Sequence, residues 1–308
     1  MWLGDVIQID EHLLHSFFNL RTNRTIQKMK THTAIVVVLF MAIMVQSAFC
    51  LKPDHKYIQI PSDVHLQYDS LNIKTTDGFR LTAWLCKSTK AQKNTVVILA
   101  SSDAGNMSYN LGLVEGLVQN LGINVLTFDY RGFGSSDHVE IDTDMLALPE
   151  FATDLQSVVN WVVQNIQPDT NKIVIYGRSM GASLAICVAA SYGGIGGVIA
   201  ESPYASQQLL NDKIKKLYAA DNIKRKVKQI ESNMLEPMSL IDKCHCKVLL
   251  IHGQDEDLIS NDEISKLYNK CGSKQKSLWI ASGAKHLETP YKEMNMFFTA
   301  FQSFLGSQ

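Results

Sequence analysis

The sequence predicts an α/β fold in which a mostly parallel sheet carries helices on both faces. From residue 94 onward, short apolar β-branched runs alternate with segments of helical periodicity, the pattern of a parallel sheet with crossover helices. The central run, residues 172–176, leads directly into a glycine-flanked serine and then an Ala- and Leu-rich segment. This order is typical of a strand, a sharp turn and a helix. With 308 residues, 46% of them apolar, the chain is long enough for one large globular domain.

The first 50 residues differ from the rest. Residues 34–51 are nearly all apolar, interrupted by Gln46 and Ser47, and the basic residues before them have no acid among them: Arg21, Arg24, Lys28 and Lys30. This charge asymmetry is typical of a translocated segment. The sequence therefore predicts a leader over residues 1–50 and a single domain over residues 51–308.

The leader has two main interpretations, and a third is that residues 34–51 form a buried core helix. A start at Met29 gives a compact signal peptide with a cut near Leu51. A start at Met1 makes the same apolar run an N-terminal anchor, barely long enough to span a bilayer. Both interpretations predict an exported protein, either secreted, periplasmic or membrane-anchored, and the second adds membrane association through residues 34–51.

The first half of the domain begins with a hairpin. Two alternating runs flank the turn signal Thr76-Asp77-Gly78, which predicts an antiparallel pair at the sheet edge. The elements that follow are expected to be a strand over 94–100, a loop over 101–106, a helix over 109–121, a strand over 123–130 and a helix over 151–166.

The second half continues the alternation. After a short strand at 197–202, residues 207–242 turn polar and Lys-rich, which predicts short helices and a short lid. The remaining elements are a strand at 247–252, a helix at 263–271, a strand at 277–281 and a closing helix at 291–305. On such sheets ligands bind at the carboxyl ends of the strands.

The turn after the central strand carries the sequence Gly177-Arg178-Ser179-Met180-Gly181. In this G-x-S-x-G arrangement a strained serine lies at the apex of a strand-to-helix turn. The two glycines are needed because the turn brings backbones so close that a side chain would collide. The helix N-terminus favours a developing negative charge at Ser179. Ser179 is therefore the candidate nucleophile.

A serine hydroxyl needs a histidine to take its proton and an acid to orient that histidine. With this turn the chain order is serine, acid, histidine. Of the nine histidines, His286 alone follows the acidic cluster Asp255-Glu256-Asp257, and it lies just after the last strand. His286 is thus the candidate base, each of the three acids could orient it, and His252 is expected to be structural.

Six cysteines are compatible with an oxidising compartment but do not require one. Cys187 is expected to be a buried apolar residue. The run Cys244-His245-Cys246 lacks the spacing of a tetrahedral zinc site and no second ligand pair follows, so no metal is predicted. A disulfide from Cys244 or Cys246 to Cys271 and unpaired buried cysteines both remain open.

From about Pro61 to the C-terminus the chain resembles the α/β-hydrolase superfamily, in particular its Bem46-like and ABHD-type serine hydrolases with a serine aminopeptidase (S33) type of domain. The motifs that carry the resemblance are Thr76-Asp77-Gly78, Phe128-Asp-Tyr-Arg-Gly-Phe-Gly134, Gly177-Arg-Ser-Met-Gly181, Ile251-His-Gly-Gln-Asp-Glu-Asp257 and Gly283-Ala-Lys-His286. The resemblance implies the α/β-hydrolase fold, and it favours Glu256 as the acid because the acid of such relatives lies three residues after the His-Gly glycine.

The resemblance also implies an oxyanion hole formed by the backbone N–H groups of Met180 and Asp103. Here the chain departs from its relatives, which usually carry His-Gly-Asn-Ala-Gly-Asn where this sequence has Ser101-Ser-Asp-Ala-Gly-Asn106. An ionised Asp103 that points inward would oppose the oxyanion. Loss of one donor from such a hole costs about 3 kcal/mol.

The function expected from these residues is hydrolysis of a carboxylic ester or thioester through an acyl-enzyme. A serine peptidase or amidase is the runner-up chemistry, and a non-catalytic binding protein of the same fold is the alternative that the altered 101–103 loop favours. No cofactor is expected, and the partner is a small-molecule acyl substrate. A net charge of −1 gives no reason to expect nucleic acid, and the oligomeric state is left open.

Overall fold

The computed structural model describes residues 50–90, 95–220, 228 and 231–306. The chain divides into two units, residues 1–48 and 49–308, and everything below concerns the second. The expected leader therefore lies outside the described residues except for Cys50, and the expected domain organisation stays a prediction.

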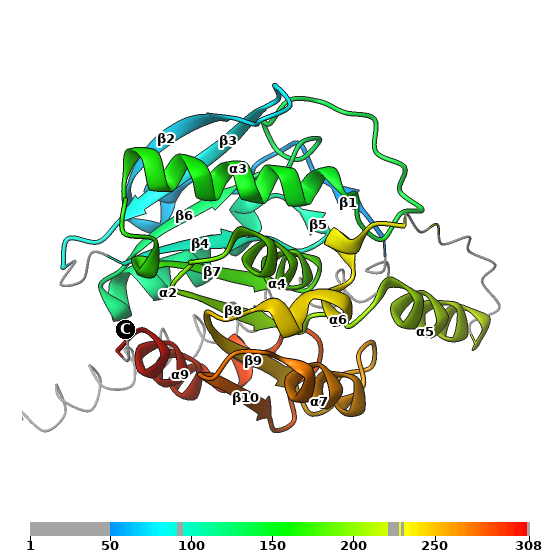
Figure 1. The fold of residues 1–308 in the computed structure, drawn as a ribbon. Helices are drawn as coiled ribbons and strands as arrows, with labels where there is room; N and C mark the ends of the chain where they lie inside the picture. The colour runs from blue at the N-terminus through cyan, green and yellow to red at the C-terminus, as the bar shows by residue number, and fades with distance from the viewer. Residues whose placement is uncertain (1–49, 91–94, 221–227, 229–230, 307–308) are drawn as a thin grey trace, which may run out of the picture. The chain divides into compact units, whose positions relative to one another are not determined.

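The described residues form a mixed sheet of eight strands in the order β10-β9-β8-β7-β4-β6-β3-β2 (Figure 1). All neighbouring pairs from β10 to β6 are parallel, while β3 pairs antiparallel with both β2 and β6. The strands are β2 (Gln67–Lys74), β3 (Arg80–Lys87), β4 (Val96–Ala100), β6 (Asn124–Phe128), β7 (Ile173–Arg178), β8 (Gly197–Glu201), β9 (Lys247–Gly253) and β10 (Lys276–Ala281).

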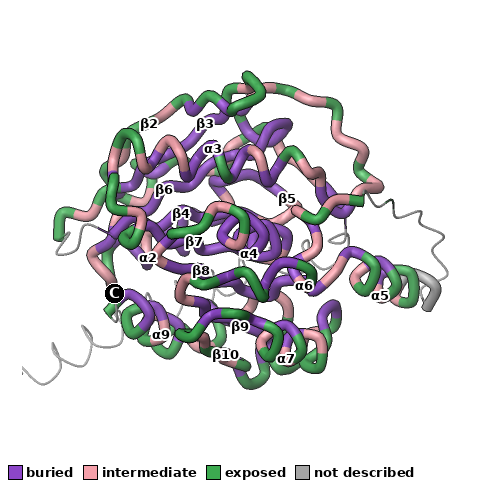
Figure 2. Tube along the Cα trace, in the orientation of Figure 1, coloured by how far each residue is buried: buried purple, intermediate pink, exposed green. Residues whose placement is uncertain are grey.

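Helices cover both faces of this sheet. The side chains of β4 and β7 alternate between two apolar clusters, with Ile98 and Ile175 in one and Val97 and Val174 in the other. The first cluster packs against α3 (Glu150–Asn165), α4 (Met180–Tyr192) and α7 (Asn261–Lys270), and the second against α2 (Leu111–Leu121) and α9 (Met294–Gly306). The central strands are buried throughout, as parallel strands covered on both faces must be (Figure 2).

The fold class agrees with the sequence prediction, and two expectations about the helices do not hold. The closing segment divides into α8 (Thr289–Lys292) and α9, because Glu293 between them leaves the helical region of φ/ψ. The interval 207–242 contains a helix of 14 residues, α5 (Gln207–Ala220), where short helices were expected, and then the short α6 (Pro237–Leu240). In Figure 1, α5 projects away from the sheet.

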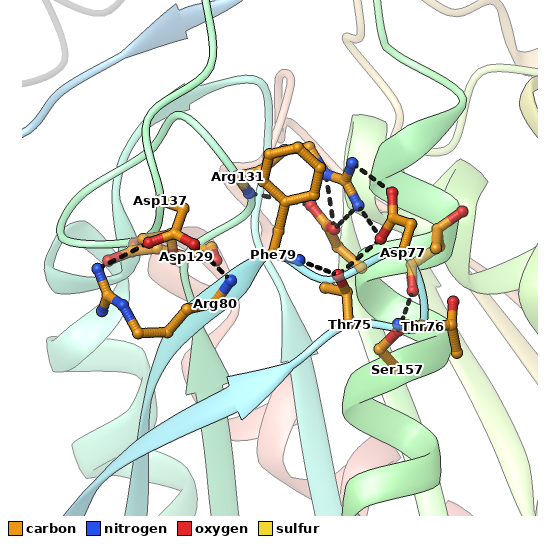
Figure 3. Close-up of polar contacts among 12 residues, drawn as sticks. Thr75, Thr76, Asp77, Phe79, Arg80, Asp129, Arg131, Asp137 and Ser157 are labelled. Carbon is orange, nitrogen blue, oxygen red and sulfur yellow. Dashed lines mark hydrogen bonds and ion pairs between the residues drawn. The ribbon is translucent and has the colours of Figure 1, made fainter.

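The edge hairpin is held to α3 through Arg131 (Figure 3). Its guanidinium donates to Asp77 at 2.7 Å in the turn between β2 and β3, and to Asp154 of α3 at 2.6 Å. The same group lies over the ring of Phe79, 4.3 Å from the centroid. Both Arg131 and Asp154 are buried, so this is a desolvated ion pair that fixes the edge of the sheet.

The start of the domain forms a second, two-stranded sheet. β1 (Lys52–Pro53) pairs parallel with β5 (Ala104–Gly105), which lies within the loop that was expected to be irregular. Cys50 and Leu51 are buried, and the Leu51 N–H donates to the Met145 carbonyl at 3.1 Å. The first described residues are therefore an integral part of the fold.

Candidate active site

Ser179 lies between β7 and α4 in a strained conformation. Its φ of 51° is in the left-handed region that non-glycine residues rarely adopt, and it forms the N-cap of α4. A Cβ on Gly177 would lie 2.3 Å from the Gly181 carbonyl oxygen, and one on Gly181 would lie 2.2 Å from the Ala100 carbonyl oxygen. The turn therefore requires both glycines, as the sequence predicts.

The imidazole of His286 contacts both of the other candidate residues. Its Nε2 lies 3.0 Å from the Ser179 Oγ, and its Nδ1 lies 2.6 Å from the Glu256 Oε1. His286 sits in the loop between β10 and α8, Glu256 in the loop after β9, and Ser179 after β7. All three loops follow carboxyl ends of parallel strands, which is why residues 107 and 30 positions apart meet.

The three acids of the cluster differ in exposure. The Glu256 side chain is fully buried, whereas Asp255 and Asp257 are exposed. Burial alone would raise the pKa of Glu256, but the charges of His286 and His252 lower it, so the carboxylate form is favoured. Of the three acids, Glu256 is the one that the structure brings to His286.

Burial and charge also oppose one another at His286. Burial alone would lower the pKa of this imidazole, but the charge of Glu256 and the hydrogen bond to it, with smaller effects of Asp103 and Glu201, raise it above its ordinary value. A base surrounded by carboxylates in this way holds an accepted proton more firmly.

His252 lies beneath this site, at the end of β9. It is fully buried, and its Nδ1 is 4.0 Å from the Glu256 Oε2. Burial lowers its pKa, so the neutral form is favoured. This placement agrees with a structural role, although it makes His252 a neighbour of the acid, which the sequence did not indicate.

The two expected oxyanion donors come from different elements. Met180 is the first residue of α4, where the N–H groups of the first turn have no partner within the helix. Asp103 lies in the loop between β4 and β5, and its carbonyl accepts from the Lys52 N–H at 2.8 Å. The β1–β5 pairing thus fixes the position of the Asp103 backbone.

The Asp103 side chain interacts electrostatically with His286. Burial raises its pKa to about 6, against smaller lowering effects of its own backbone N–H and of the charges of His286 and Lys52. The carboxyl group is therefore close enough to His286 for the two charges to interact. Above pH 6 it adds a negative charge near the imidazole.

Sequence reasoning missed a buried ion pair behind the serine. Arg178 ends the central strand, and its Nε donates to the Glu201 Oε2 at 3.0 Å, with both side chains buried. A signal was present, because an arginine beside the candidate nucleophile, at the end of an otherwise apolar strand, requires a partner.

The cysteines contribute no covalent link. Cys244, Cys246 and Cys271 are free, so the disulfide interpretation is wrong for this structure; the Cys244 Sγ instead donates to the Ile186 carbonyl at 3.5 Å. Cys187 is buried, as expected. Within the described residues, no group of three His, Cys, Asp or Glu side chains is arranged to hold a metal ion.

Comparison with known proteins shows which proteins the chain is similar to. A family model described as "Serine aminopeptidase, S33" matches residues 96–243. Protein bem46 of Schizosaccharomyces pombe is 24% identical over 236 residues, which cover 75% of each chain. The α/β hydrolase domain-containing protein WAV2 of Arabidopsis thaliana is 27% identical over 124 residues, and the match spans 38% of its length. The chain is therefore similar to the α/β-hydrolase superfamily over these residues.

The solved structures agree with this assignment. The Pyrococcus furiosus esterase Pf2001 superposes on this structure with a TM-score of 0.71 and 20% identity, over 84% of this chain and 98% of the esterase. At that identity the likeness shows the fold. The family supports a hydrolase, and the bond that it cleaves is a separate question.

Three observations bear on membrane association. An uncharacterized membrane protein of Saccharomyces cerevisiae is 24% identical over 238 residues, which cover 76% of this chain. Among the helices that the structure describes, none is both long and apolar enough to cross a bilayer. Residues 34–49 of the apolar run lie outside the described part of the chain.

Proposed function

We propose that the protein is a serine hydrolase that cleaves carboxylic esters or thioesters through an acyl-enzyme intermediate. The observation that carries the proposal is the continuous contact from the Ser179 Oγ to the His286 Nε2 at 3.0 Å and from the His286 Nδ1 to the Glu256 Oε1 at 2.6 Å. Nucleophile, base and orienting acid in hydrogen-bonding sequence are what activation of a serine requires.

In the proposed reaction the Ser179 Oγ attacks the substrate carbonyl while His286 takes its proton at Nε2. Glu256 accepts from the Nδ1–H, holds the ring in the required tautomer and stabilises the imidazolium. The N–H groups of Met180 and Asp103 stabilise the oxyanion. His286 then gives its proton to the departing alkoxide or thiolate, and water repeats the sequence on the acyl-enzyme.

Two observations bear on which bond the proposed hydrolase cleaves. The structural relative Pf2001 is named an esterase, and esters and thioesters need less protonation of the leaving group than amides do. The family model is named for an aminopeptidase, so amide cleavage is the second candidate. The Asp103 carboxyl in the expected oxyanion loop favours a different alternative, in which the protein binds a partner and has no catalytic activity.

The test is labelling of the purified full-length protein with a fluorophosphonate probe, beside Ser179→Ala. The probe requires an activated serine and an oxyanion site but no knowledge of the substrate. Labelling that disappears in the variant supports the proposal, and competition by p-nitrophenyl esters, acyl thioesters and aminoacyl amides then ranks the bond types. A folded protein that fails to label refutes the hydrolase and leaves the binding protein.

The proposal places this hydrolase outside the cytosol or on a membrane, with a small acyl compound as its partner. Its support is the apolar run at residues 34–51 with basic residues before it and the membrane protein among the relatives. Fractionation of cells that express the full chain, followed by a carbonate wash, distinguishes a secreted from an anchored protein.

A further inference from the structure

Arg178 donates hydrogen bonds to three separate elements. Besides the Glu201 carboxylate at the end of β8, its Nη1 donates to the Asn110 Oδ1 at 2.9 Å and its Nη2 to the Leu287 carbonyl at 3.0 Å. Asn110 precedes α2, and Leu287 follows the base His286 directly. A planar guanidinium spreads five donors over three nitrogens and can reach such separated acceptors, whereas an ammonium carries its three donors on a single atom.

Backbone strain concentrates around this arginine. Four non-glycine residues in the described chain have positive φ, and three of them are Ser179, Ser202 and Leu287, with φ of 51°, 51° and 59°. Ser179 follows Arg178 in sequence, Ser202 follows its partner Glu201, and Leu287 carries the carbonyl that Arg178 binds. Such conformations cost free energy and persist only where their surroundings fix them.

The network also reaches the oxyanion loop. The Asn110 Nδ2 donates to the Ser101 Oγ at 3.1 Å, and Ser101 is the first residue after β4 in the loop that contains Asp103. On its other side, the Tyr176 hydroxyl donates to Glu201 at 2.5 Å and fixes the carboxylate that Arg178 binds. The arginine thus links the loops of the nucleophile, the base and one oxyanion donor.

We infer that Arg178 is a positioning residue for the hydrolytic reaction, which sets the His286 loop and the Ser101–Asp103 loop relative to Ser179. This inference rests on the proposed function of the same site. Arg178 itself is buried and acts through residues that it holds, so it is expected to change the rate of the chemical step and not the binding of substrate.

The test compares Arg178→Gln and Arg178→Lys with the full-length wild type in turnover of a p-nitrophenyl ester. A displacement of about 1 Å in reacting groups costs about a hundredfold in rate, so kcat should fall about a hundredfold in Arg178→Gln with KM unchanged. Arg178→Lys keeps the charge but not the three simultaneous contacts, so it should recover part of that loss and remain about tenfold slow.

Arg131→Gln is the matched control, because it also breaks a buried arginine–carboxylate pair, the one with Asp154 at the hairpin. It should lose stability and keep the wild-type kcat in the folded fraction. The inference is overturned if Arg178→Gln stays within threefold of the wild-type kcat, if KM rises while kcat holds, or if Arg131→Gln slows turnover equally.

If Arg178→Gln does not fold, Arg178→Lys alone tests whether Arg178 is a positioning residue. A slower kcat at wild-type melting temperature supports the inference, and a wild-type kcat refutes it. Fluorophosphonate labelling of the wild type separates the two proposals. If the wild type labels, the serine hydrolase stands whatever the arginine variants do; if it does not, both proposals fall.

Discussion

Gly181→Ala should inactivate the site while leaving most of the fold in place. The added Cβ would lie 2.2 Å from the Ala100 carbonyl oxygen and 2.4 Å from the Ser101 carbonyl oxygen, both backbone atoms that cannot rotate away. Ordinary contact begins near 3.4 Å, so α4 and the end of β4 must separate by about 1 Å in a close-packed interior. That displacement moves the Met180 N–H away from the loop of Asp103.

The expected result is a fall of about a hundredfold in the rate of fluorophosphonate labelling, the usual cost of misplacing reacting groups by about 1 Å. Overpacking of this kind also costs about 1–3 kcal/mol of stability, which urea denaturation measures. Gly112→Ala is the control: nothing lies within 4 Å of its Cβ site in α2, so it should keep wild-type labelling and gain about 0.5–1 kcal/mol. Wild-type labelling by Gly181→Ala would refute the claim that the two backbones meet there.

Three further predictions test other parts of the structure. Asp103→Asn removes a charge that raises the pKa of His286. The acid limb of the pH profile of the labelling rate should therefore move to lower pH, and the rate on that limb should rise roughly tenfold for each unit by which the pKa falls. An acid limb at the wild-type position contradicts this prediction. Glu256→Gln should slow labelling about 10⁴-fold, as loss of the orienting acid does elsewhere, and Asp257→Asn, at an exposed position, should not. Arg131→Met should lower the free energy of unfolding, measured by urea denaturation, by about 3–5 kcal/mol because it leaves Asp154 unpaired. Adding Asp154→Leu should restore most of that loss. Equal losses in the single and double variants would contradict a buried ion pair.

Much of the fold could be predicted from the sequence because its strands are continuously apolar and its turns carry glycine. The segment from β7 to α4 is the clearest case: the two glycines around Ser179 are needed for steric reasons that act within five residues. Position relative to the last strand sufficed to select His286. The choice of Glu256 over its two acidic neighbours depended on resemblance, because nothing local says which of three adjacent carboxylates turns inward.

The remainder could not be predicted because it depends on contacts between distant residues. Arg178 binds groups 23, 68 and 109 positions away, and no periodicity encodes such a set. The pKa of Asp103 is raised by burial, and that burial depends on how its loop packs in the folded protein, so the sequence alone did not predict it. The pairing of β1 with β5 joins segments about fifty positions apart through two residues each, too short for a strand signal.

That small sheet bears on where the catalytic domain starts. The Asn106 side chain donates to the carbonyls of Asp54 and Lys56, and the Tyr109 hydroxyl to the Asp54 carboxylate, so residues 52–56 form one wall of the oxyanion loop. A domain boundary drawn after Lys56, as homology to the sheet alone would suggest, would leave that loop without its support. Loss of residues 52–56 would thus change the loop of Asp103 while leaving Ser179, Glu256 and His286 themselves intact.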